Sequence, residues 1–285
     1  MRFNGDRVFS VGNHAFLIFA ALITLYPMWR ELSISFSSME EAMKGGVFLW
    51  PRGLTTDAYQ FVLESEYIWT AYRNSIFITV AGTLIAVLFT ATTSYPLIKS
   101  GLPVRKALLY GILFTLLFNG GIIPTYLLVK GIGLLDSLWS LILPNAISAY
   151  NVIVMMSFFR TIPLELEESA MMDGANPIRV FFQIILPLSK PVLATIAIWE
   201  AVGFWNNYLQ AIFYLNDKSN YILPVLLKDI IEGQELAQMT GEITGSSTDS
   251  VIAATIMLSI IPIVCVYPFL QKYFVQGTLI GSVKG

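Results

Sequence analysis

Long apolar stretches alternate with shorter polar segments along the whole chain. A helix needs about 20 mostly apolar residues to cross the hydrocarbon core of a bilayer. The stretches that meet this requirement predict six transmembrane helices, at residues 14–37, 70–98, 106–130, 137–159, 188–214 and 250–274. We therefore expect an all-α integral membrane protein with a single transmembrane domain over residues 1–285.

Composition supports this class and weakens others. Hydrophobic residues make up 55% and charged residues 13% of the chain, whereas soluble domains contain about 25% charged residues. The net charge is -2 and no Lys/Arg run occurs, so nothing points to nucleic acid as a partner. One histidine, His14, and one cysteine, Cys265, lie far apart in the sequence, and we expect neither a metal site nor an intrachain disulfide.

The distribution of positive charge predicts how the helices are oriented. The first apolar stretch is not followed by a small-residue cleavage site, so we expect it to remain as a spanning helix. Lys and Arg are more frequent in the segments that lie inside if the N-terminus is inside, and Lys99–Lys106 is the clearest short inner loop. This bias predicts cytoplasmic N- and C-termini, a cytoplasmic loop at 160–187 and outer loops at 38–69 and 215–249.

The two outer loops carry most of the acids outside the predicted helices. Their acidic side chains fit either a solvated surface or direct contact with a solute, and the sequence leaves both readings open. Within the second loop, residues 240–248 are small and polar, which predicts a mobile segment.

The third predicted helix contains an interruption. It includes Asn119-Gly-Gly-Ile-Ile-Pro124, and both glycine and proline weaken a helix. A break at membrane depth is tolerated only where protein or water covers the freed backbone groups. We expect Gly120, Gly121 and Pro124 to shape a kink or a gate.

The hydrophilic loop at 160–187 reads as two short helices with a sharp bend. Pro163 suits the first turn of a helix, and Gly174 is the residue type favoured just past a helix end. Asn176-Pro177 can then restart a helix as N-cap and first position. The first turn also carries three acids that face the positive end of the helix dipole: Glu165, Glu167 and Glu168.

This loop resembles a known motif. Glu168-Ser-Ala-Met-Met-Asp-Gly174 is followed, after nine residues, by Ile184-Ile-Leu-Pro187, which is similar to the EAA loop of ATP-binding-cassette importer permeases. Ser169 stands where that family usually has alanine, and it is nearly as small. The resemblance implies a cytoplasmic coupling hairpin between helices four and five that docks onto a separate ATPase through Glu168, Ser169, Ala170, Asp173, Gly174, Ile184, Leu186 and Pro187.

The rest of the chain resembles the second permease subunit of maltose-type carbohydrate importers, in the branch that handles complex oligosaccharides. The order of six helices, the large outer loop before the last helix and the segments Asn119–Pro124, Pro268–Phe274 and Gly281–Gly285 carry this likeness. It implies a bacterial cell membrane, a second permease, two cytoplasmic ATPases that bind ATP and Mg, an extracellular solute-binding protein and a saccharide substrate. It also implies an ATPase contact at Val283, Lys284 and Gly285.

The chain itself is not expected to be an enzyme or to hold a cofactor. It lacks any Gly-Lys-Ser/Thr sequence, which a phosphate-binding loop would require. A membrane enzyme would instead need clustered His, Asp or Cys near one membrane face, and the sequence offers no such cluster. The resemblance therefore implies a non-catalytic subunit of an ATP-hydrolysing complex.

The fifth predicted helix is the candidate solute path. Glu200 lies near mid-membrane, where a carboxylate is costly and is therefore a functional candidate. Helical spacing places Phe204 and Asn207 on the same side as Glu200. Aromatic rings can stack on the apolar face of a sugar and amides can bond its hydroxyls. The candidates are Glu200, Phe204, Trp205, Asn206, Asn207, Tyr208 and Asn119.

Two alternatives remain at this point. The polar groups of the fifth helix can instead bond neighbouring helices and hold the bundle together. The whole protein can also be an ion- or proton-coupled secondary transporter that uses Glu200 as its coupling group. Such transporters often contain internal repeats, and none is evident in this chain.

Overall fold

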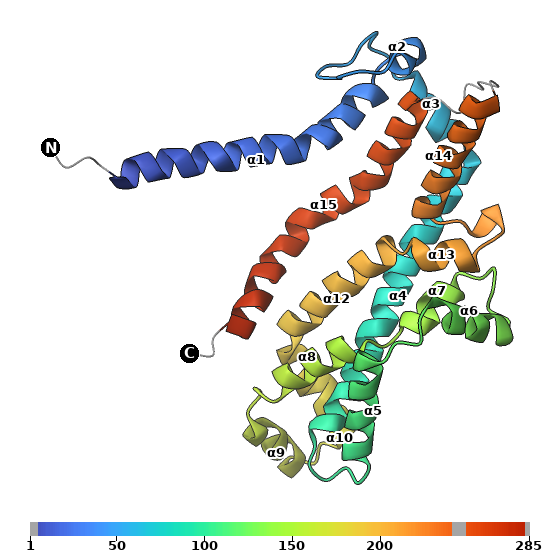
Figure 1. Ribbon diagram of the computed structural model, residues 1–285. Coiled ribbons are helices and arrows are strands. Elements are labelled where there is room, and N and C mark those ends of the chain that lie inside the picture. Colours follow the sequence, from blue (N-terminus) through green and yellow to red (C-terminus); the bar gives the residue numbers. More distant parts are fainter. Residues whose placement is uncertain (1–4, 241–248, 283–285) are drawn as a thin grey trace. The chain divides into compact units, whose positions relative to one another are not determined.

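The computed structural model describes residues 5–240 and 249–282, and these residues form helices and loops without a β-strand (Figure 1). The chain divides into two compact units, one made of Met1–Ile68 with Leu227–Pro262 and the other of Trp69–Leu226 with Ile263–Gly285. The elements follow in the order α1 (Gly5–Ser35), α2 (Met39–Met43), α3 (Asp57–Glu64), α4 (Glu66–Ile98), α5 (Arg105–Leu117), α6 (Ile122–Gly131), α7 (Trp139–Ile142), η1 (Leu143–Asn145), α8 (Ala149–Phe159), α9 (Leu164–Met172), α10 (Pro177–Val180), η2 (Phe181–Ile185), α11 (Leu186–Leu188), α12 (Lys190–Trp205), α13 (Leu209–Tyr214), η3 (Lys218–Asn220), α14 (Leu223–Thr240) and α15 (Asp249–Ser282).

The predicted membrane spans correspond to these helices. Among the described residues, α1, α4 and α15 are each long and apolar enough to cross a membrane without interruption. Three bent pairs pass the same test of length and composition when their two parts are taken together: α5 with α6, bent by 118°, α7–η1 with α8, bent by 50°, and Pro177–Leu188 with α12, bent by 78°. The last pair begins before the predicted span at 188–214, because its first part belongs to the loop at 160–187. The prediction of an all-helical fold is therefore confirmed, whereas the single transmembrane domain stays a prediction.

The break in the third span lies where the sequence predicts it. Helix α5 ends at Leu117, and Gly121 has φ +86° just before α6, a backbone conformation that glycine adopts without strain. The Asn119 side chain accepts a hydrogen bond of 2.9 Å from the Gly121 N–H and so supports the turn. The predicted kink at Gly120–Gly121 is confirmed.

Two other spans are broken where the sequence predicted continuous helices. The span at 137–159 is interrupted between η1 and α8, where Pro144 and Ser148 flank the break. The span at 188–214 is interrupted between Trp205 and Leu209. Asparagine side chains compete with the helix for backbone groups, and the Asn206 amide donates to the Val202 carbonyl at 2.9 Å. The prediction of regular helical spacing through Asn207 was therefore wrong.

The first unit folds its part of the predicted outer loop, residues 38–68, against the ends of its helices. Trp29 of α1 donates its ring N–H to the Leu49 carbonyl at 2.7 Å, and its ring meets Trp50 edge-on at 5.5 Å between ring centres. A small apolar core joins the end of α1 and α2 to the start of α15; its members are Ile34, Ala42, Phe48 and Ala253. The predicted outer loop is thus an ordered part of this unit.

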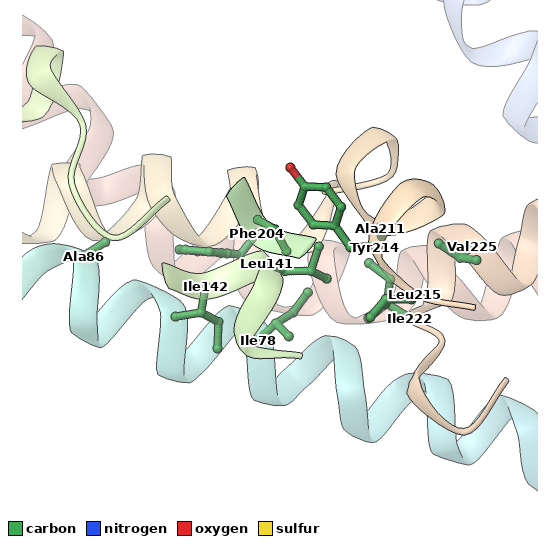
Figure 2. Packing of buried hydrophobic residues seen from close by; sticks show 11 residues of the cluster. Ile78, Ala86, Leu141, Ile142, Phe204, Ala211, Tyr214, Leu215, Ile222 and Val225 are labelled. Atoms are coloured by element: carbon green, nitrogen blue, oxygen red, sulfur yellow. The ribbon is translucent and has the colours of Figure 1, made fainter. Parts of the chain in front are cut away.

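The second unit has its core between α4, α7 and α13. Figure 2 shows the buried side chains of this core beside α4; they include Ile78, Leu141, Ile142, Phe204, Ala211, Tyr214, Leu215 and Ile222. At Gly82 of α4 the Phe204 ring comes so close that an added Cβ would lie 2.7 Å from it. Glycine at this position lets α4 and α12 pack together.

Polar groups tie the segment after α13 to the rest of this unit. The Asp136 carboxylate accepts hydrogen bonds from the backbone N–H groups of Asn216 and, at 2.9 Å, Asp217. These bonds hold the pKa of Asp136 below its ordinary value. Asn74 of α4 donates to the Ser219 carbonyl at 2.9 Å. The start of the predicted second outer loop is therefore fixed, while residues 241–248, where mobility was predicted, lie outside the described residues.

Candidate functional site

The hairpin formed by α9 and α10 has the two-helix geometry that its sequence predicts. Pro163 precedes α9, and Gly174 has φ +84° just past its end. The Gly174 and Ala175 N–H groups bond the Met171 and Ala170 carbonyls, each at 3.0 Å, which is the glycine-terminated Schellman arrangement. Asn176 then caps α10 by accepting from the Arg179 N–H at 2.8 Å.

The predicted coupling residues divide into a solvent-facing set and a packed set. Glu168, Ser169, Asp173 and Gly174 are exposed, and space is open where a Gly174 side chain would project. Ala170, Ile184 and Leu186 are half-buried against an apolar cluster of α4, α8, η2 and α12. Pro187 is exposed and lies within α11, which ends at Leu188. Val283, Lys284 and Gly285 lie outside the described residues.

Glu167 differs from its two acidic neighbours, and sequence reasoning missed this. It was expected, like Glu165 and Glu168, to face the positive end of the helix dipole, and its side chain is buried. Its carboxylate accepts hydrogen bonds from the Lys99 ammonium and, at 3.1 Å, from the Tyr95 hydroxyl. The sequence does place Lys99 in the preceding inner loop, but only the tertiary structure brings it to the hairpin.

An apolar groove runs between the hairpin and the end of α4. Its volume is about 770 Å³, and its walls come from α4, the 101–103 turn, α9, α10 and η2. Both Lys99 and Glu167 line it, together with Glu168. The hairpin is thus separated from α4 on this side by open space and attached to it at a few defined contacts.

A second hollow lies beside the end of α12, in the region where the sequence placed the solute path. It has a volume of about 230 Å³ and is lined by Asn145, Glu200, Gly203, Phe204, Asn207 and Gln210. Three of the seven predicted path residues therefore share one cavity, even though the helix between them is interrupted. Asn145 and Gln210 complete its polar wall.

Hydrogen bonds organise this cavity. Asn151 of α8 donates to one Glu200 carboxylate oxygen at 2.5 Å. The Gln210 side-chain oxygen accepts from Asn145 at 2.6 Å and from Asn207 at 3.0 Å. The amides of η1, of the break after α12 and of α13 therefore bond mainly to one another. The resulting wall combines carboxylate and amide groups, which can bond the hydroxyls of a polyol.

The other predicted path residues lie elsewhere. Phe204 lines the cavity but is only 2% exposed, and its ring packs on Gly82, so it cannot offer an open face for stacking. Trp205 is buried, while Asn206 and Tyr208 are exposed and lie outside the cavity lining. Asn119 belongs to the break between α5 and α6. In the described part of the chain, no group of three His, Cys, Asp or Glu side chains could hold a metal ion.

Comparison with known proteins agrees with the sequence motif. Residues 85–280 match the family described as binding-protein-dependent transport system inner membrane component. Two relatives come from Bacillus subtilis strain 168. Protein LplC is 43% identical over 98% of this chain and 96% of its own length, and the polygalacturonan/rhamnogalacturonan transport system permease protein YtcP is 40% identical over 98% and 99%.

A solved structure supports the same assignment. It is described as the crystal structure of a bacterial ABC transporter involved in the import of the acidic polysaccharide alginate. One of its chains is similar to this one with a TM-score of 0.86 and 37% identity, over 96% of this chain and 99% of that one. The resemblance to importer permeases is confirmed, and the ion-coupled carrier finds no support among these similarities.

Proposed function

The chain belongs to the family of binding-protein-dependent transport system inner membrane components, and from this premise we propose that it is one of two permease subunits that import a saccharide across a bacterial cell membrane. The other subunits are a second permease, two cytoplasmic ATPases and an extracellular solute-binding protein. The saccharide class is supported by the names of the similar proteins, which transport polygalacturonan or rhamnogalacturonan and alginate.

The hairpin carries this proposal. An ATPase subunit must bind the permease at a rigid segment. The helices α9 and α10 form such a segment, because hydrogen bonds cap the end of α9 and the start of α10. Glu168, Ser169, Asp173 and Gly174 are exposed on it and supply the docking surface. Because no side chain occupies the space at Gly174, a partner can approach the backbone closely there.

The cavity beside α12 supplies part of the solute path. Glu200, Asn207 and Gln210 offer oxygen and nitrogen atoms at the same hollow. Sugar hydroxyls both donate and accept hydrogen bonds, so they suit a wall of this kind. During alternating access, ATP closes the ATPase dimer, the hairpins move with it, and the helices open outward.

ATP and Mg belong to the partner ATPases in this scheme. The present chain contains no Gly-Lys-Ser/Thr sequence for a phosphate-binding loop. Its N- and C-termini and its hairpin face the cytoplasm, in agreement with the distribution of Lys and Arg.

Reconstitution tests the proposal. The complete transporter, assembled from the products of the neighbouring reading frames, is placed in vesicles with the binding protein and labelled oligogalacturonide or a neutral oligosaccharide outside. We expect uptake that requires ATP on the hairpin side and persists when the membrane potential is collapsed. Uptake that continues without ATP while the potential is held would contradict the proposed function.

A further inference from the structure

We propose that Glu167 and Lys99 form the link through which movement of the hairpin reaches α4, which makes them positioning residues for transport. The inference rests on the proposed function, because it presumes that an ATPase moves the hairpin. It concerns residues that the docking motif itself does not include.

Glu167 is the anchor of α9. Every residue of α9 is described, and Glu167 is the one that is buried, with 5% of its surface exposed. A helix attached by an apolar face would bury its leucines and methionines, but in α9 these side chains are exposed: Leu164, Leu166, Met171 and Met172. Apart from Ala170, which is half-buried against the apolar cluster, the attachment of α9 to the rest of the unit therefore runs through one carboxylate.

The carboxylate is held by two groups at the end of α4. Both the Lys99 ammonium and the Tyr95 hydroxyl donate to the same oxygen of Glu167. The Lys99 nitrogen also lies 4.7 Å from the centre of the Tyr95 ring, so a cation–π contact joins the two donors. These three side chains form one charge-assisted cluster, which is stronger and more directional than a neutral hydrogen bond.

The second helix of the hairpin is attached in a different way. The Phe181 ring lies 5.0 Å from the Tyr95 ring between centres, and Val180, Phe181 and Ile185 are buried in the apolar cluster. Apolar packing is non-directional, whereas the ion pair fixes a donor against an acceptor. Because both attachments meet at Tyr95, displacement of the hairpin must displace the end of α4.

The neighbouring acids provide an internal contrast. Glu165 and Glu168 belong to the same helix, but both are exposed. Three acids within four positions therefore have different surroundings: Glu167 is buried against the end of α4, whereas Glu165 and Glu168 are exposed, and Glu168 borders the groove. This difference supplies a matched control, because Glu165 has the same chemistry and the same helix without the anchor.

The test compares Glu167→Gln, Lys99→Gln, the exchange Glu167→Lys with Lys99→Glu, and Glu165→Gln in the reconstituted complete transporter. The measured quantities are co-purification of the ATPase and the ratio of solute imported to ATP hydrolysed. We expect each single anchor variant to keep its ATPase and to lower this ratio by about tenfold, the scale of one lost charge-assisted hydrogen bond. The exchange should restore most of the ratio, and Glu165→Gln should leave it unchanged.

The link is overturned if the Glu167→Gln complex assembles and its ratio of solute imported to ATP hydrolysed equals that of the Glu165→Gln complex. The link is also overturned if the exchange variant assembles but imports no better than the single variants. If Glu167→Gln fails to assemble, the exchange variant serves as the deciding test. A merely structural anchor would lower the amount of complex without changing the ratio. If the wild-type complex shows no ATP-driven uptake, the proposed function fails instead.

Discussion

Two carboxylates in largely apolar surroundings, Glu167 in the hairpin and Glu200 beside the cavity, are stabilised in different ways. Glu167 is paired with the Lys99 ammonium and almost fully buried. Glu200 receives a hydrogen bond from the neutral Asn151 amide and lines an open hollow. A cation neutralises its partner and suits a fixed attachment, whereas an amide leaves the carboxylate charge available to a ligand or water. The comparison suggests force transmission at the hairpin and recognition at the cavity.

The largest effect is expected at the docking surface of the hairpin. Gly174→Trp should reduce uptake to the background of empty vesicles while the protein still inserts in the membrane, because the indole fills the space that a partner needs. Uptake by the reconstituted complex and membrane fractionation are the measurements.

The variant Gly174→Ala separates the effect of side-chain size from the effect of backbone strain at this position. A non-glycine residue at φ +84° is strained by about 1–2 kcal/mol, so alanine should lower stability moderately and preserve much of the uptake. Normal uptake by the tryptophan variant would remove the docking role of this position.

The cavity side of the comparison depends on Glu200. Glu200→Ala should lower uptake by about tenfold to a hundredfold, since a hydrogen bond to a charged group contributes about 1.5–3 kcal/mol, while the yield of assembled complex changes little. Uptake is measured at a saturating concentration of the binding protein, and the yield of assembled complex is measured by size-exclusion chromatography. Parallel loss of both would assign Glu200 a structural role in bonding α8 to α12 through Asn151.

The apolar wall of the cavity can be tested separately from its polar wall. Gly82→Ala should lower the melting temperature of the complex, because its Cβ would lie 2.7 Å from the Phe204 ring and overpacking costs about 1–3 kcal/mol. Gly111→Ala in α5 is the control, since nothing lies within 4 Å of its added Cβ. Equal melting temperatures for the two variants would show that the Phe204 ring moves aside easily.

A third carboxylate, Asp136, extends the comparison to an exposed site and should give the smallest effect. Backbone N–H groups lower its pKa below the ordinary value of 3.8. Its stabilising contribution is therefore fully present above that value and is lost only as the pH falls through the lower folded-state pKa. Between pH 5 and pH 8 we expect Asp136→Asn to shift the melting temperature by an amount that does not depend on pH. A shift that grows between pH 8 and pH 5 would contradict this.

The sequence predicted the hairpin better than the cavity, for a local reason. Helix ends depend on neighbouring residues, so Gly174 and Asn176 could be assigned as end and cap without knowledge of the rest of the fold. The cavity depends on residues from η1, α12 and α13, and its predicted helical register failed at Asn206. Asn145 of η1 and Gln210 of α13 share its wall because their side chains hydrogen-bond to each other across 65 positions of the sequence.

What the sequence determined by itself was the class of protein: apolar stretches of spanning length, a polar loop with helix stops and starts, and the spacing of the docking motif. These follow from hydrophobicity and backbone preference, which act over a few residues. Only the tertiary structure decided which of the three acids of α9 is buried, because Lys99 lies 68 positions before Glu167 and its approach depends on how the helix ends pack. The same holds for the Glu200 cavity, whose polar wall is assembled from separate helices.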